Sequence, residues 1–119
     1  MKRLYTLVLL LLMFFADQEL MAQVDVKIDV LLGRVSLEQN YPNPSIDETN
    51  LPFSIPEKTK VKLEVYNIVG VKVVTVVDEE LNAGEHVYKL DTSNLKNGLY
   101  IYRLTAGKET AIRRMKVAR

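Results

Sequence analysis

The sequence lacks cysteine entirely and has a single histidine among its 119 residues. Without cysteine there is no disulfide framework, no zinc–thiolate centre and no cysteine nucleophile. One imidazole leaves little material for a transition-metal site. Four carboxylates, Asp78, Glu79, Glu80 and Asp91, could offer oxygen to calcium, but their spacing matches no calcium loop and favours a solvated loop. We therefore expect neither a metal nor another cofactor.

An excess of charge of one sign is also lacking, since 16 basic residues face 15 acidic ones and the net charge is +1. A nucleic-acid partner normally requires a clear basic excess, so none is expected. Catalytic motifs are missing too. His86 stands beside Glu85 without a serine elbow, a glycine-rich phosphate loop or paired carboxylates. We expect neither an enzyme nor a small-molecule substrate.

The chain begins with three residues that include Lys2 and Arg3, followed by an apolar run over residues 4–15. That run is shorter than the roughly 20 residues that cross a bilayer, and its length suits a secretory signal. We predict a signal peptide over 1–22, cut after Ala22, with a buried amino-terminal helix as the alternative. The signal implies export from the cytoplasm.

Residues 23–34 form the next unit, and they allow two interpretations. Apolar and charged residues alternate over 24–30, which indicates an extra edge strand, but residues 31–34 break the pattern, which favours an extended linker. Residues 40–45 cannot be regular structure, because Pro42 and Pro44 remove backbone donors and fix φ. We name residues 40–44 of this segment the corner, and we predict it to be rigid and extended.

Short β patterns fill the rest of the chain, and no helical period is sustained outside the signal. Strands are predicted over 35–39, 51–55, 61–67, 71–77, 86–90, 99–105 and 109–117. Pro52 predicts an edge position for the second, and 99–105 is expected to be central. Short strands at this spacing predict one all-β domain, a seven-stranded antiparallel immunoglobulin-like β-sandwich over 35–119.

Five segments of this region resemble, in order, motifs of the C-terminal sorting domain of the type IX (Por) secretion system. They are LEQNYPNP at 37–44, FSIP at 53–56, VYNIVG at 65–70, AGEH at 83–86 and LKNGLYIYRL at 95–104. The resemblance implies the same sandwich and a sorting function. It also implies a route from the periplasm through an outer-membrane translocon to the cell surface or medium, and removal by a sortase-like peptidase.

The sequence departs from that family in two respects. Ser45 follows the corner where the family usually has an aromatic residue, and only residues 23–34 separate the domain from the signal, where the family carries a large cargo. The alternative function is a structural module, since the Tyr-Asn-x-x-Gly and Gly-x-Tyr-x-Tyr-Arg-Leu patterns also resemble the immunoglobulin-like domain of flagellar hook-capping proteins.

Two groups of residues are candidates for recognition by the secretion machinery. The corner residues Asn40, Tyr41, Pro42, Asn43 and Pro44 present a preformed backbone, and Arg113, Arg114 and Lys116 make the last strand basic. Structural alternatives remain open, because the corner could simply set the entry of the chain and edge charges oppose aggregation. The resemblance implies structural roles for Tyr66, Asn67, Gly70, Gly84, Gly98, Tyr100, Tyr102 and Arg103.

Overall fold

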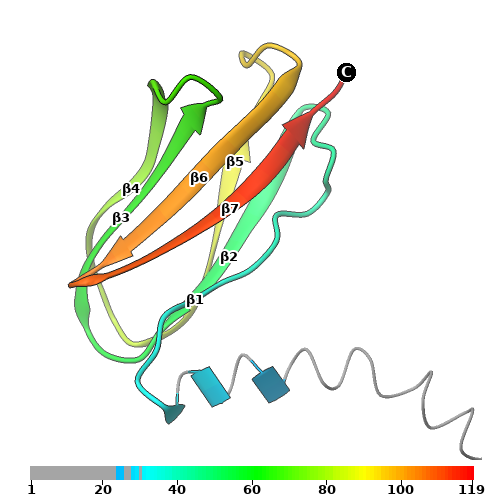
Figure 1. Ribbon diagram of the computed structural model, residues 1–119. Coiled ribbons are helices and arrows are strands. Elements are labelled where there is room, and N and C mark those ends of the chain that lie inside the picture. The colour runs from blue at the N-terminus through cyan, green and yellow to red at the C-terminus, as the bar shows by residue number, and fades with distance from the viewer. Residues whose placement is uncertain (1–23, 26–27, 30) are drawn as a thin grey trace, which may run out of the picture.

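The computed structural model describes residues 24–25, 28–29 and 31–119, in which seven strands form two sheets (Figure 1). The strands are β1 (Ser36–Leu37), β2 (Glu48–Ile55), β3 (Thr59–Asn67), β4 (Lys72–Leu81), β5 (Gly84–Asp91), β6 (Gly98–Ala106) and β7 (Glu109–Val117). The predicted signal peptide lies outside the described residues. Within them, no helix is long and apolar enough to cross a membrane.

All neighbouring strands pair antiparallel, in a three-stranded sheet of order β1-β2-β5 and a four-stranded sheet of order β4-β3-β6-β7. The two sheets contribute to one hydrophobic cluster, with Leu51, Phe53 and Ile55 from β2 and alternate residues of β3 and β6. The all-β prediction is confirmed. The central position of residues 99–105 is confirmed as well, because β6 lies between β3 and β7.

The hairpin of β3 and β4 follows directly from its sequence. Alternation sends Val61, Leu63 and Val65 into the core, where each is fully buried. The turn then needs a residue at positive φ, and Gly70 adopts φ 87° without strain. The strands predicted at 61–67 and 71–77 are thus joined by a reversal, which brings β4 back along the outer edge of the four-stranded sheet.

The edge position predicted for residues 51–55 is wrong, because β2 pairs with β1 on one side and β5 on the other. Pro52 has no N–H to give, but its carbonyl accepts from the amide of Glu38 at 3.0 Å. The carbonyl of Glu38 consequently receives nothing from Pro52, and it accepts the Tyr102 hydroxyl at 2.7 Å instead. A distant side chain thus supplies the donor that proline lacks.

The loop predicted over residues 78–84 is also wrong in part, since β4 continues to Leu81 and carries the acidic residues within the strand. Asp78 and Glu80 face lysines of β3 in the register of the sheet. The ion pairs Lys58–Glu80 and Lys60–Asp78 close at 3.2 Å and 3.9 Å. Opposite charges across the ladder favour pairing where the apolar pattern gives no signal.

The described residues among 24–35 do not form the extra edge strand that was one interpretation of 24–30. Helical geometry is found instead at residues 24, 25, 28, 29 and 31. The amide of Leu32 donates to the carbonyl of Ile28 at 2.9 Å, as in a helical turn. Alternation of apolar and charged residues was too short here to specify a strand.

Candidate recognition surface

The corner is built on one buried residue. Asn40 is 2% exposed, and its Nδ2 donates to Thr49 Oγ1 at 3.0 Å and to the carbonyl of Pro42 at 3.3 Å. The backbone of Tyr41 exchanges two hydrogen bonds with Asn50, at 3.1 Å and 2.8 Å. Both X–Pro bonds of the corner are cis. Asn40 was a candidate for recognition, but its burial gives it a structural role and leaves the exposed residues 41–44 to a partner.

The hydroxyl of Tyr102 holds the corner to the four-stranded sheet. Tyr102 is fully buried, accepts from the Asn40 amide at 2.9 Å and donates to the carbonyl of Glu38 at 2.7 Å. Burial raises the pKa of this hydroxyl to about 12. A tyrosine on a strand often keeps its hydroxyl at the surface, whereas the hydroxyl of Tyr102 lies inside the fold. The buried hydroxyl donates to the carbonyl of Glu38, which receives no hydrogen bond from Pro52.

Because of that pKa, the free energy of unfolding is expected to fall between about pH 10 and pH 12. A free tyrosine ionises near pH 10, so the unfolded state loses this proton first. Below that pH the stabilisation is complete, and it is lost as the pH rises through the folded pKa. The change amounts to roughly 3 kcal/mol. Denaturant titrations across this range measure it.

The matched comparison is Tyr102→Phe, which lacks the ionising group but keeps the ring. Its stability is expected to decline less over the same pH interval, because the variant lacks the buried ionising group. An equal decline in both proteins would contradict the assignment to Tyr102.

The corner is also fastened to the last strand. The amide of Lys116 donates to Asn43 Oδ1 at 3.0 Å, and the amide of Ser45 donates to the carbonyl of Lys116 at 2.7 Å. The amide of Ala118 then donates to the carbonyl of Ser45 at 2.9 Å, so that residue 45 pairs parallel with residue 117. The two segments proposed separately for recognition are therefore one continuous surface.

A polar contact replaces the aromatic residue that the resemblance led us to expect after the corner. Ser45 is fully buried, and its hydroxyl lies 2.6 Å from that of Thr92, which is equally buried. Arg119 holds the same loop, donating from Nη1 to the carbonyl of Thr92 at 2.6 Å and from Nη2 to the carbonyl of Leu95. The small side chains of Ser45 and Thr92, with their hydroxyls hydrogen-bonded to each other, thus fill the space where the corner meets the loop at 92–95.

The basic residues of β7 divide into two kinds. Arg113 Nε donates to the carbonyl of Leu37 at 2.6 Å, which ties the segment before the corner to β7. Gln39 Nε2 adds a bond to the carbonyl of Arg114 at 2.8 Å. This edge of the sheet is therefore occupied in part by residues 35–45. The side chains of Arg114 and Lys116 are exposed, and they remain available to a partner.

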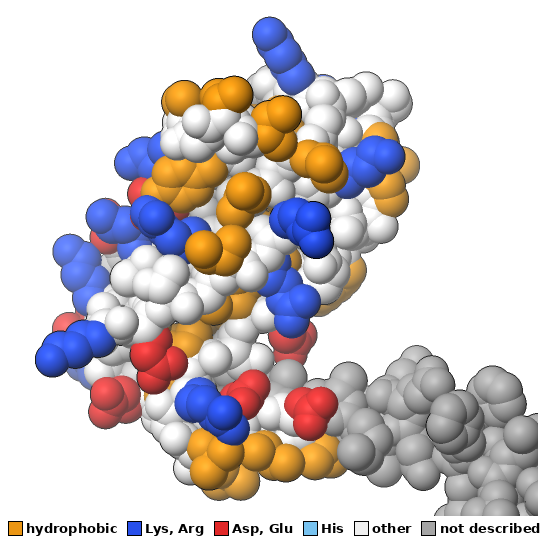
Figure 2. All heavy atoms as spheres, in the orientation of Figure 1, with side chains coloured by type: hydrophobic (Ala, Val, Ile, Leu, Met, Phe, Trp, Pro, Cys, Tyr) orange, Lys and Arg blue, Asp and Glu red, His pale blue; other side chains and the backbone are white. Residues whose placement is uncertain are grey.

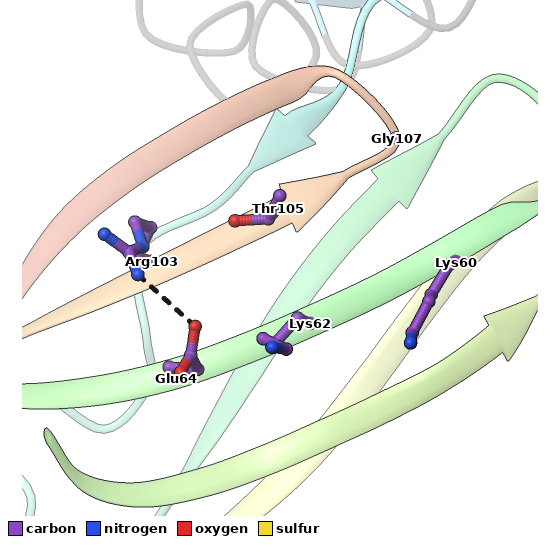
Figure 3. Close-up of a pocket in the computed structure, with 6 residues that line it drawn as sticks. All are labelled: Lys60, Lys62, Glu64, Arg103, Thr105 and Gly107. Atoms are coloured by element: carbon purple, nitrogen blue, oxygen red, sulfur yellow. Dashed lines mark hydrogen bonds and ion pairs between the residues drawn. The ribbon is translucent and has the colours of Figure 1, made fainter.

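The outer face of the four-stranded sheet carries a charged cluster around Glu64 (Figure 3). Although it points away from the core, Glu64 is 5% exposed, because Arg103 and Lys72 close over it at 3.4 Å and 3.5 Å. Burial raises its pKa, but the hydrogen bond from Arg103 and the nearby lysines outweigh burial and lower the pKa below the ordinary value. Arg103 also donates to the Tyr66 hydroxyl and lies 4.8 Å from the centre of that ring.

Beside this cluster is an open hollow of about 360 Å³. Figure 3 shows Lys60, Lys62 and Glu64 along β3, with Arg103 and Thr105 beside them on β6 and Gly107 at the following turn. Three cations and one carboxylate line the hollow, but Arg103 is paired with Glu64 and Lys60 with Asp78. The sequence pattern did not single out Glu64, because its partners come from two other strands.

The other residues for which the resemblance implies structural roles lie mainly at chain reversals and at the starts of strands. Asn67 begins the β3–β4 turn, Gly84 starts β5 and Gly98 starts β6. Tyr100 is 7% exposed and its hydroxyl donates to the carbonyl of Lys96 at 2.7 Å, which holds the loop before β6. These residues thus lie at a chain reversal, at strand starts and in the core.

Among the described residues, no group of three or more histidine, cysteine, aspartate or glutamate side chains is arranged to hold a metal ion. No curated protein sequence matches this chain. The sequence does match the family of secretion system C-terminal sorting domains over residues 39–118, which includes the corner, all strands from β2 onward and the basic end of β7. The chain belongs to the family of secretion system C-terminal sorting domains.

Proposed function

We propose that residues 35–119 are a sorting signal for the type IX secretion system, and that the machinery recognises them as a folded, non-catalytic domain. Family membership supports the sorting role and a secretion machinery as partner. The finer proposal has three steps. The signal peptide delivers the chain to the periplasm, the outer-membrane translocon binds the domain, and a sortase-like peptidase removes it. Two sheets around a shared core support an immunoglobulin-like sandwich as the architecture recognised.

The surface proposed for recognition consists of residues 41–44 with Arg114 and Lys116, and we name it the corner–strand surface. The observation that carries this proposal is the bond from the Lys116 amide to Asn43 Oδ1, with the paired bonds of Ser45 beside it. They fix the corner in place before any partner arrives, so that little conformational entropy is lost on binding. The two exposed cations favour an acidic partner and speed its approach.

A fluorescent protein inserted between Gln23 and Val35 tests the sorting role directly. In a strain with a working type IX system, the fusion is expected to reach the cell surface or the medium. Fractionation and protease accessibility of intact cells measure its position. Retention in the periplasm, with the domain intact and folded, would contradict the proposed function.

Reversing charge on the corner–strand surface is expected to slow export of that fusion. The variant Arg114→Glu/Lys116→Glu keeps both positions exposed and leaves the core untouched. We expect roughly a tenfold lower export rate, equivalent to about 1.4 kcal/mol of binding. Pulse-labelled cultures measure that rate.

The matched control is Lys58→Glu/Lys108→Glu, which makes the same change of charge at the β2–β3 and β6–β7 turns, away from the corner. It is expected to be exported normally. Equal slowing in both variants would assign the effect to net charge and contradict a local recognition surface.

A further inference from the structure

The β3–β4 hairpin ends in a group of exposed aliphatic side chains, which we name the apolar tip. Ile68 is 72% exposed, Val69 78% and Val71 57%. Leu99, 53% exposed, lies on β6 just beyond the paired residues Asn67 and Tyr100. Figure 2 shows hydrophobic side chains at the end of the molecule where Figure 1 places this hairpin and the start of β6. Turns are normally made of polar residues, so this composition requires a reason.

The backbone of the turn is hydrogen-bonded within the turn itself. Asn67 Oδ1 accepts from the amides of Val69 and Val71, at 3.1 Å and 2.9 Å. The amide of Gly70 donates to the carbonyl of Asn67 at 3.0 Å, and the Asn67 amide donates to the carbonyl of Val71 at 2.9 Å. Backbone groups that are already paired can leave water at small cost. The tip is therefore able to enter an apolar medium.

The segments around the tip are rich in positive charge, and Glu64 of β3, the carboxylate next to Lys72, is already paired with both Lys72 and Arg103. Segments 65–77, 92–108 and 110–119 contain no aspartate or glutamate. Lys72 stands opposite Tyr66 in the sheet, Lys116 stands opposite Leu99, and Lys96 precedes β6. Lysines placed around an apolar projection are suited to anionic lipid headgroups.

Two features favour a membrane over a protein as the occupant. The tip projects from the end of a hairpin, and it is purely aliphatic, whereas the centres of protein interfaces are enriched in Trp, Tyr and Arg. Three neighbouring side chains also cover much less than the roughly 800 Å² per partner of a specific protein interface. We propose that the apolar tip, with Leu99, inserts into the interface of an anionic lipid bilayer while the three lysines contact headgroups.

The absence of cysteine provides a direct test on the full chain. Val69→Cys and Val87→Cys each receive one environment-sensitive fluorophore, since residue 87 is a similarly apolar position, 55% exposed, on β5 of the other sheet. Vesicles of phosphatidylethanolamine and phosphatidylglycerol are expected to shift the emission at 69 to the blue and to make it sensitive to lipid-borne quenchers. The label at 87 is expected to stay in water. Vesicles of phosphatidylcholine alone are expected to give a weaker shift.

Substitution complements the labels. Ile68→Asp/Val69→Asp is expected to lower partitioning into the anionic vesicles roughly tenfold, whereas the control Val87→Asp is expected to leave it unchanged. A circular dichroism melt checks that each variant is folded. We expect all of them to fold, because the substituted side chains are exposed.

Three results would overturn the proposal. The first is no shift at 69, and the second is an equal shift at 69 and 87, which would assign attachment to another segment such as the apolar run at 4–15. The third is a shift at 69 that appears only when a purified secretion protein is added, which would make the tip a protein-docking site. None of these measurements involves sorting, so their failure leaves the proposed function standing.

Discussion

Replacing Tyr102 by alanine is expected to lower the free energy of unfolding by about 3–5 kcal/mol, a large part of the roughly 5–15 kcal/mol typical of a small domain. The side chain is fully buried in the shared core. Its loss leaves a cavity and also leaves the Asn40 amide and the Glu38 carbonyl without their partner. Denaturant unfolding followed by circular dichroism measures the change.

Two further variants separate the ring from the hydroxyl. Tyr102→Phe retains the packing and is expected to cost about 1–3 kcal/mol, because a buried backbone donor loses its acceptor. Leu99→Ala on the same strand changes a side chain on the outer face, and we expect a change within about 0.5 kcal/mol. If Tyr102→Ala and the unmodified protein unfolded at the same denaturant concentration, the bonds from the Tyr102 hydroxyl to residues 38 and 40 could not be what holds the corner.

Deleting residues 115–119 is expected to abolish cooperative folding. Met115 is 1% exposed and Val117 is fully buried, and truncating such side chains costs about 2–5 kcal/mol each. The deletion also removes the Lys116 and Ala118 backbone bonds to the corner and the clamp that Arg119 places on the loop at 92–95. The combined loss exceeds what a domain of this size can withstand.

A thermal melt and limited proteolysis measure that loss, with Arg114→Glu/Lys116→Glu as the folded reference. The comparison matters for any export experiment, because a truncated chain that stays inside the cell reports unfolding, not missing recognition. A deletion variant that melts cooperatively and resists protease would contradict the burial of residues 115 and 117.

Local pattern was sufficient for much of the fold. Strict alternation predicted which side of β3 faces the core, and the burial of Val61, Leu63 and Val65 confirms it. The Asn67–Gly70 reversal was predictable because its turn chemistry lies within four consecutive residues. Tyr100, Tyr102 and Leu104 share the buried face of β6, as their period of two predicts.

Contacts between distant segments could not be predicted in the same way. The partners of the Tyr102 hydroxyl lie 62 and 64 positions earlier in the chain, and nothing near residue 102 specifies them. Pro52 indicated an edge strand because a missing donor was assumed to stay unreplaced. The alternation of β3 indicates an ordinary solvent-facing position for Glu64, but Arg103 and Lys72 bury it, and only the register of the sheet brings these two residues close.

Asn40 shows the same limit within the candidate site. Its position in a proline-rich segment indicated exposure, and four of the five corner residues are indeed exposed. The fifth turns inward because Thr49, on β2, completes its hydrogen bonding at 3.0 Å. The family resemblance covers the whole segment and does not separate the buried Asn40 from the exposed residues 41–44.

The fastening of the corner to β7 joins residues that are separated by more than seventy positions, with Lys116 and Asn43 73 apart and Arg113 and Leu37 76 apart. Contacts of such length form late in folding, because a long loop must first be closed. The corner accordingly stays unanchored until β7 has joined the sheet. A chain in which β7 is not in place therefore leaves the corner without these bonds, so that the shape of residues 40–44 depends on a strand seventy positions away.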